Sequence, residues 1–319
     1  MISNDEMGGV GHLLISEFHV ENKVDYQPPT TKKSTNIAIF MQDTNVVNSL
    51  RNNSNLEHLK SLVEIKIEET TDKLCYVVGH CKVDQKYDPA LELFAIFQKL
   101  SELAPDMAQQ MVHCVLQISG MNCFGTVNQA YCHFFSNGLN RPSRVCIANN
   151  FLNPNQQVAI ECLLDRKKNN SSNVYANSTL FVQSVSEWAP SCIGPYSQAT
   201  SQEKLLRLAG QIAFVPETME LINSSNIDEA LDLQTSQSLK NINQVLDGMR
   251  EARVEDCFRC LTYLNYGKLT DVQKSQEIVR HSFEIHASKL VSNNKCLMQT
   301  VFVPDLPRGA LGATEDRIC

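Results

Sequence analysis

The chain has 319 residues, of which 43% are hydrophobic and 20% charged, and its formal net charge is −7. Such a length suggests two domains, and the composition is that of an ordinary globular protein. The acidic balance argues against a nucleic-acid-binding protein, because phosphate contacts need many Lys and Arg residues. We see no membrane-spanning apolar run and no signal-peptide pattern, and we therefore expect a cytoplasmic protein that binds neither membranes nor nucleic acid.

Helix and strand patterns occur in an order that is repeated along the chain. The first series follows a polar linker at residues 25–36. Its first helix is predicted over residues 89–104, where apolar residues recur at helical spacing and Pro89 suits the first turn. A second helix is predicted at residues 125–135. The strands of this series are predicted at residues 73–83, 111–118, 144–151 and 157–164.

The second series follows another polar linker at residues 165–179 and repeats the order of the first. Its elements are a strand at 204–214, a helix at 228–252, a strand at 257–264, a helix at 270–290 and a strand at 296–303. Such a duplication implies two similar α+β units, each with two helices on one face of a mixed sheet. Residues 312–319 contain adjacent Glu315 and Asp316 where the first series alternates apolar residues. We therefore expect the last strand to be incomplete.

The 12 cysteines are expected to be mostly free thiols in a reducing compartment. Cys257 and Cys260 form a C-x-x-C pair, but no second pair or histidine pair stands at a zinc-binding spacing. The pair also falls in a predicted strand, where residues three apart point to opposite faces. We predict buried structural cysteines and no metal site, and we interpret His113 as a packing residue.

Four motifs resemble the RidA/YjgF family of enamine and imine deaminases. Residues 193–199 read IGPYSQA, residues 208–221 read LAGQIAFVPETMEL, residues 304–311 read PDLPRGAL, and residues 142–146 supply P-x-R-x-C. The resemblance covers residue 57 to the C-terminus. It implies an α+β fold of two tandem chorismate-mutase-like domains, at residues 57–165 and 181–319, joined by a linker at 166–180.

A narrower resemblance involves residues 181–199 and their single Trp188. They are similar to the start of the second RidA-like unit in the diphthine–ammonia ligase family, in which two such units follow an ATP-pyrophosphatase domain. Residues 3–23 look like the last strand of that ATP domain, so residues 1–56 are expected to be its remnant plus a linker. The S-G-G-x-D-S phosphate loop is missing. We expect the C-terminal part of such a ligase, or a product that lost the front, with no cofactor of its own.

The RidA resemblance also implies candidate site residues. In the family an Arg binds the substrate carboxylate, a Glu positions water, and a Tyr and a Gly-rich strand end close the pocket, without a metal or organic cofactor. In the first unit the matching residues are Gly79, Arg144, Cys146 and Glu161. In the second they are Tyr196, Ser197 and Gly210, while Met298 stands at the arginine position.

Neither unit holds the whole set, so two interpretations stay open. Because family sites lie between subunits of a trimer, the half-sets can form a composite pocket across an interface, or the motifs can be retained for structure alone. In the composite pocket Arg144 is expected to point at the cleft that holds Tyr196, and Glu161 is its expected partner when no ligand is bound. A small carboxylate metabolite would be the ligand.

Three functions follow from these resemblances. The first is the RidA-like tail of a ligase that amidates diphthine on elongation factor 2, for which ATP is implied in the full-length family. The second is a free-standing imine deaminase. The third is a non-catalytic module that binds a metabolite or a protein. Oligomers through RidA-like interfaces fit all three, whereas the endoribonuclease activity ascribed to the family fits the acidic charge least.

Overall fold

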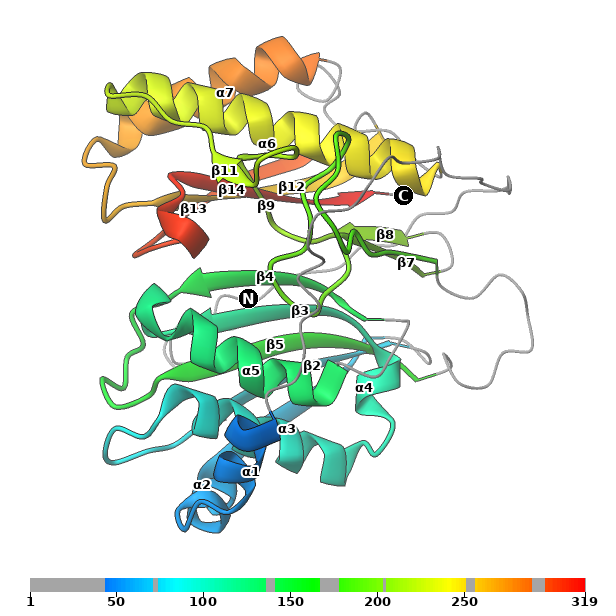
Figure 1. The fold of residues 1–319 in the computed structure, drawn as a ribbon, viewed down its shortest axis with the longest axis vertical. Coiled ribbons are helices and arrows are strands. Elements are labelled where there is room, and N and C mark those ends of the chain that lie inside the picture. The colour runs from blue at the N-terminus through cyan, green and yellow to red at the C-terminus, as the bar shows by residue number, and fades with distance from the viewer. Residues whose placement is uncertain are drawn as a thin grey trace.

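The computed structural model describes residues 44–70, 74–135, 141–166, 178–202, 205–250, 256–288 and 296–318. Of the predicted remnant and linker at residues 1–56, residues 1–43 lie outside the described ranges, and so does most of the linker at 166–180. The chain forms four layers, with helices outside and two sheets facing each other between them (Figure 1). No helix within the described ranges is long and apolar enough to cross a membrane.

The first half of the chain builds a five-stranded mixed sheet in the order β1-β2-β5-β3-β4. Strands β3 and β4 are parallel and the other neighbours antiparallel. The strands are β1 (Val63–Glu69), β2 (Leu74–Cys81), β3 (Met111–Ile118), β4 (Ser143–Ala148) and β5 (Val158–Asp165). One face is covered by α3 (Pro89–Leu103) and α5 (Phe124–Phe135), with α1 (Thr44–Arg51), α2 (Leu56–Leu62), α4 (Met107–Gln110) and the short 3₁₀ turn η1 (Met121–Cys123) nearby.

The second half builds a sheet in the order β13-β12-β14-β8-β7-β6, to which β9 adds by pairing with β14. Its strands are β6 (Thr179–Leu180), β7 (Ala199–Gln202), β8 (Leu205–Leu208), β9 (Gln211–Ile212), β12 (Cys257–Asn265), β13 (Leu297–Val303) and β14 (Gly312–Ile318). The outer face carries α6 (Ile227–Met249) and α7 (Val272–His286). A hairpin of β10 (Phe214–Val215) and β11 (Glu220–Leu221), and the 3₁₀ turn η3 (Pro307–Gly309), complete the half.

Side-chain caps fix where the main helices begin. The Asp88 carboxylate accepts from the backbone N–H groups of Ala90 and Leu91 at 2.9 and 3.1 Å, and Pro89 occupies the first turn of α3 as predicted. Asn226 caps α6 and Asp271 caps α7 in the same way. These caps satisfy N–H groups that have no partner within a helix.

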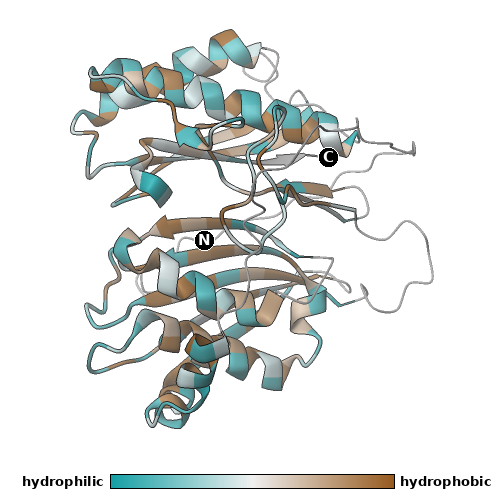
Figure 2. Cartoon of the chain, in the orientation of Figure 1, coloured by the Kyte–Doolittle hydropathy of each residue, from teal (hydrophilic) through white to brown (hydrophobic). Residues whose placement is uncertain are grey.

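The inner faces of the two sheets pack against each other through a separate apolar cluster. Val115, Val145 and Ile147 come from the first sheet, and Leu261 and Ala313 come from the second. Figure 2 shows apolar residues along the strands of both layers and polar residues on the outer helices. The first half of the chain therefore buries both faces of its sheet, one under its helices and one under the second half.

The structure overturns one prediction about the C-terminal end. Strand β14 is complete and central, since it pairs with β12 on one side and with β8 and β9 on the other. The inner face of β14 lies against the first sheet, which offers polar as well as apolar partners, so strict apolar alternation is not required there. Glu315 is only 3% exposed and faces His113 across that boundary. The expected strand at 204–214 is instead divided into β8, β9 and β10.

Candidate ligand-binding site

The second half of the chain covers the outer edge of β4, the last strand of the first sheet. An uncovered edge would leave backbone groups unpaired. The IGPYSQA segment and the chain around Gly210 supply partners instead, and Ser143 and Ser197 form a parallel bridge. The covering bonds are Ser197 N–H to Pro142 O at 3.0 Å, Gly210 N–H to Arg144 O at 3.2 Å, and Ala148 N–H to Asp305 O at 3.1 Å.

A small cavity, partly open to solvent, lies where this segment meets β4. Its wall combines residues from both halves of the chain. Four of the seven residues predicted from the family resemblance line it, namely Arg144, Cys146, Tyr196 and Gly210. Ser197 lies beside it, but its hydroxyl donates to the backbone carbonyl of Arg141 at 2.8 Å. Apolar side chains such as Phe124 and Phe214 form much of the remaining wall.

Arg144 supplies the positive charge of the cavity. It is 3% exposed, and its Nη1 donates to Asn128 Oδ1 at 2.8 Å. Its guanidinium carbon lies 4.6 Å from the centre of the Tyr131 ring and 4.8 Å from that of Tyr196. Such contacts stabilise a cation. Within the described ranges no Asp or Glu pairs with Arg144, and a buried charge without a counterion is costly. The site therefore favours an anionic ligand.

The close approach of the IGPYSQA backbone to Arg144 explains its glycine. A Cβ on Gly194 would lie 2.5 Å from Arg144 Nη2 and 2.9 Å from Asn128 Oδ1. The Asn128 Nδ2 also donates to the carbonyl of Ile193 at 3.1 Å. The motif thus holds the arginine and its amide partner in place as well as covering the strand edge.

Two titratable groups in the wall, the Cys146 thiol and the Tyr196 phenol, stay neutral at physiological pH. Burial raises the pKa of Cys146 to about 12, although the positive charge of Arg144 acts in the opposite direction. Burial, followed by the neighbouring Cys192 thiol, raises the pKa of Tyr196 well above its ordinary value. Because a cysteine reacts as its thiolate, Cys146 is poorly suited to nucleophilic attack. The wall can bind and orient a ligand, with Tyr196 as a neutral hydroxyl.

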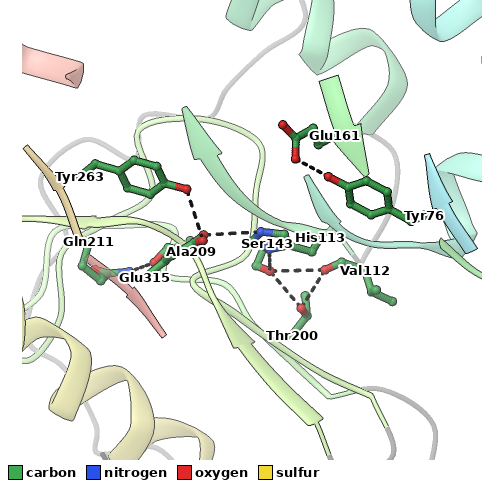
Figure 3. A network of polar contacts seen from close by, with 10 residues as sticks. All are labelled: Tyr76, Val112, His113, Ser143, Glu161, Thr200, Ala209, Gln211, Tyr263 and Glu315. Carbon is green, nitrogen blue, oxygen red and sulfur yellow. Dashed lines mark hydrogen bonds and ion pairs between the residues drawn. The ribbon is translucent and has the colours of Figure 1, made fainter. Parts of the chain in front are cut away.

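Glu161 does not belong to this cavity, and its expected pairing with Arg144 is wrong. Val115 stands beside both Glu161 and Val145 in the sheet, so the side chains of these three residues share one face. Arg144, next to Val145 in β4, therefore points to the opposite face. Glu161 accepts a hydrogen bond from the Tyr76 hydroxyl, as Figure 3 shows.

Gly79 also lies away from the cavity, and its role is packing. A Cβ there would lie 2.9 Å from the Ile96 side chain of α3. The predicted set of seven residues therefore separates into a group at the cavity, the neighbouring Ser197, and two residues of the first sheet that serve its own packing and hydrogen bonds.

The prediction missed three residues that complete the wall or support Arg144. Asn128 and Tyr131 are three residues apart on α5, a spacing that places them on one helix face. Gln211 belongs to the quoted LAGQIA motif and lines the cavity. Its Nε2 donates to Gln198 Oε1 at 2.6 Å, and Gln198 Nε2 donates to the carbonyl of Pro190 at 2.7 Å. In the sequence, only the polar side chains of these residues, within a predicted helix and a quoted motif, could have indicated their role.

A second polar cluster joins the two sheets without lining the cavity (Figure 3). His113 Nδ1 lies 2.8 Å from Ser143 Oγ, and its Nε2 lies 3.6 Å from Glu315 Oε2. The Tyr263 hydroxyl donates to Glu315 Oε1 at 3.3 Å. His113 thus makes polar links beyond the predicted packing role. Ser143 is fully buried, which argues against a nucleophile. Within the described ranges no group of three potential ligands could hold a metal ion.

Comparison with known proteins agrees with these features. The family model described as Endoribonuclease L-PSP matches residues 186–293. The diphthine–ammonia ligase of Saccharomyces cerevisiae is 27% identical over 267 residues, which are 79% of this chain and 37% of that protein. The Schizosaccharomyces pombe ligase is 31% identical over 147 residues, 46% of this chain and 22% of that protein. The chain thus spans well under half the length of these two relatives.

A match to a smaller protein shows the family of this chain, and a match to a solved structure shows its fold. RutC family protein SSO3206 of Saccharolobus solfataricus is 34% identical over 125 residues, 39% of this chain and 86% of that protein. A chorismatase crystal structure matches with a TM-score of 0.57 and 13% identity, over 80% of this chain and 79% of that one, which shows a shared α+β fold. The chain belongs to the RidA/RutC family and carries an Endoribonuclease L-PSP domain.

Proposed function

We propose that the chain is the RidA-like portion of a cytosolic diphthine–ammonia ligase and that its cavity binds a small carboxylate. Two tandem RidA-like units, at residues 57–165 and 181–319, form the proposed arrangement. The match to the Saccharomyces cerevisiae ligase over 79% of this chain supports the ligase assignment. The remainder of the ligase would supply ATP chemistry, and elongation factor 2 would be the protein partner.

The observation that carries the ligand proposal is the Arg144 guanidinium, which is buried in the cavity wall without a carboxylate partner among the described residues. A guanidinium binds a carboxylate through two parallel N–H donors. Asn128 and the rings of Tyr131 and Tyr196 hold it in place, and the apolar wall accepts a short carbon chain.

A deaminase reaction is the second candidate. The chain is 34% identical over 58 residues to a mouse 2-iminobutanoate/2-iminopropanoate deaminase, which favours this reading. The family mechanism needs a carboxylate that positions water, however, and Glu161 lies on the other face of the sheet. We therefore favour binding over turnover.

Calorimetric titration of the chain with 2-oxobutanoate and its neutral amide tests the ligand. Hydrogen bonds to charged groups are worth about 1.5–3 kcal/mol, so the carboxylate should bind at least about tenfold more tightly than the amide. Arg144→Ala should remove that preference and Arg144→Lys should keep part of it. Arg166→Ala is the matched control, because Arg166 is half exposed and pairs with Glu69. Equal affinity for the acid and the amide, or no binding of either, would refute the proposal that the cavity binds a carboxylate.

The ligase role needs its own test. A Saccharomyces cerevisiae ligase whose matching C-terminal region is replaced by this chain should restore diphthamide on elongation factor 2 in cells that lack the ligase, as measured by mass spectrometry. Failure of this replacement, in a protein that accumulates normally and binds the carboxylate, would refute the ligase role alone.

A further inference from the structure

Two cysteines meet at the start of the β12–β13 pair. Cys257 is the first residue of β12, and Cys296 directly precedes β13. Their sulfur atoms lie 3.8 Å apart. The ladder pairs Arg259 with Leu297, so Cys257 is one residue away from the position opposite Cys296. Strands about 4.8 Å apart and a rise of about 3.3 Å per residue give a Cα separation of about 6 Å, within the range of about 4.4–6.8 Å that a disulfide spans. A bond length of about 2.05 Å requires the sulfurs to move closer by less than 2 Å.

A β-bulge places both cysteines of the C-x-x-C motif in the same core. The register of β12 against β14 shifts between Cys257 and Arg259. A bulge inserts a residue and changes the face that the following side chains take. Cys257 and Cys260 consequently both belong to the core under the helices, contrary to the expected opposite faces. Cys296 packs against that same core.

The two sulfurs differ in access to solvent. Cys257 is 2% exposed, whereas Cys296 is only partly buried. The next two residues along β13, Leu297 and Met298, are exposed. A dissolved oxidant therefore reaches the Cys296 sulfur first. The Cys257 sulfur is buried and can react only with the oxidised Cys296.

We propose that Cys257 and Cys296 are a redox modification site, which a peroxide converts reversibly into an intrachain disulfide. The Cys296 thiolate attacks one oxygen of hydrogen peroxide, the O–O bond breaks and hydroxide leaves, so that Cys296 becomes a sulfenic acid. The Cys257 thiol loses its proton and attacks that sulfur, and water leaves as the S–S bond forms. Two thiols are oxidised by two electrons, and one peroxide is reduced to two waters.

The chain contains its own control. Cys114 and Cys162 stand opposite each other in β3 and β5, with sulfurs 3.7 Å apart. Both are buried, at 0% and 1% exposure, between the first sheet and its helices. The two pairs thus have nearly the same separation and differ in access to solvent. Peroxide should oxidise Cys257 with Cys296 and leave Cys114 with Cys162 reduced.

The test treats the folded, fully reduced chain with hydrogen peroxide, blocks remaining thiols under denaturing conditions, and maps the peptides by mass spectrometry. The expected product is a Cys257–Cys296 crosslink with the mass of two hydrogens lost, which dithiothreitol reverses. In Cys257→Ser, Cys296 should instead accumulate as a sulfenic acid that dimedone captures.

Three outcomes would overturn the proposal. One is the absence of this crosslink when other thiols have reacted. Another is formation of the Cys114–Cys162 crosslink at the same rate, which would remove access as the controlling factor. The third is a Cys257–Cys260 disulfide in its place. Circular dichroism before and after oxidation establishes that the reaction occurs in the folded protein.

Discussion

The carboxyl group of Glu92 should make the stability of the fold depend on pH. Glu92 lies in the first turn of α3 and is 0% exposed. Its Oε2 accepts from the backbone N–H groups of Gln157 and Val158 at 3.0 and 3.2 Å, which ties the start of β5 to the helix, while its Oε1 has no hydrogen-bond partner. Burial raises the pKa of Glu92 from 4.5 to about 7, although these two bonds act against the rise.

The sign and size of the effect follow from this pKa. Because the folded pKa is above the unfolded one, the folded state binds the proton more tightly. The contribution is complete below pH 4.5 and is lost as pH rises through 7. The whole rise corresponds to about 3 kcal/mol, at about 1.36 kcal/mol per pH unit, and most of it falls between pH 5 and pH 8. Glu92→Gln, which mimics the neutral acid, should remove that dependence.

Urea unfolding of the wild type and of Glu92→Gln at pH 5 and pH 8 measures the effect. The variant should gain about 2–3 kcal/mol relative to wild type on going from pH 5 to pH 8. Glu57→Gln is the control, since that side chain is 81% exposed on the neighbouring α2, and its profile should follow the wild type. A Glu92→Gln profile parallel to wild type would refute the reasoning.

Three further predictions concern the cavity, helix α5 and the edge of the second sheet. Gly194→Ala should destabilise the fold by about 1–3 kcal/mol and weaken carboxylate binding, because the added methyl meets Arg144. Gly125→Ala in α5, where a Cβ meets nothing within 4 Å, should stabilise by up to about 1 kcal/mol in the same denaturation assay. Leu297, Met298 and Val301 are exposed on the edge strand β13, whereas every residue of β4, the edge strand of the first sheet, is buried. We therefore expect a second copy to cover β13 and Val301→Lys to reduce self-association in sedimentation, and a monomeric wild type at high concentration would contradict this.

The helices and strands whose own residues show a clear apolar pattern are the ones that the sequence predicts well. Strand β3 has the predicted bounds, and α3 and α5 differ from prediction by a single residue at one end. Helices α3 and α5 carry apolar residues at helical spacing, and β3 is a short apolar run of the length typical of a buried strand. The strand predicted at 204–214 is interrupted by a contact with a distant part of the chain. The Gly210 N–H donates to the backbone carbonyl of Arg144 in β4 instead of to a strand of its own sheet.

The positions of Glu161 and Glu315 show what the sequence alone leaves undetermined. Which face a strand residue occupies depends on its register with neighbours that are distant in the chain. Glu161 lines up with Val145 and so turns away from Arg144. In the sequence Glu315 interrupts an apolar alternation. In the structure the first sheet covers Glu315 and places His113 beside its carboxylate. Neither the register nor the second layer can be read from spacing along the chain.

The division of the family residues between the two halves follows from where the cavity lies. Its walls are the edge strand β4 and the segment of the second half that covers it, so each half contributes only the side chains of its own wall. Arg144 comes from β4, and Tyr196 comes from the covering segment. Strand β13 is an edge of the second sheet, and Met298 is 37% exposed at the matching position. Asn128 and Tyr131 of α5 and Tyr196 of the covering segment hold Arg144, so this cavity needs no arginine at position 298 to be complete.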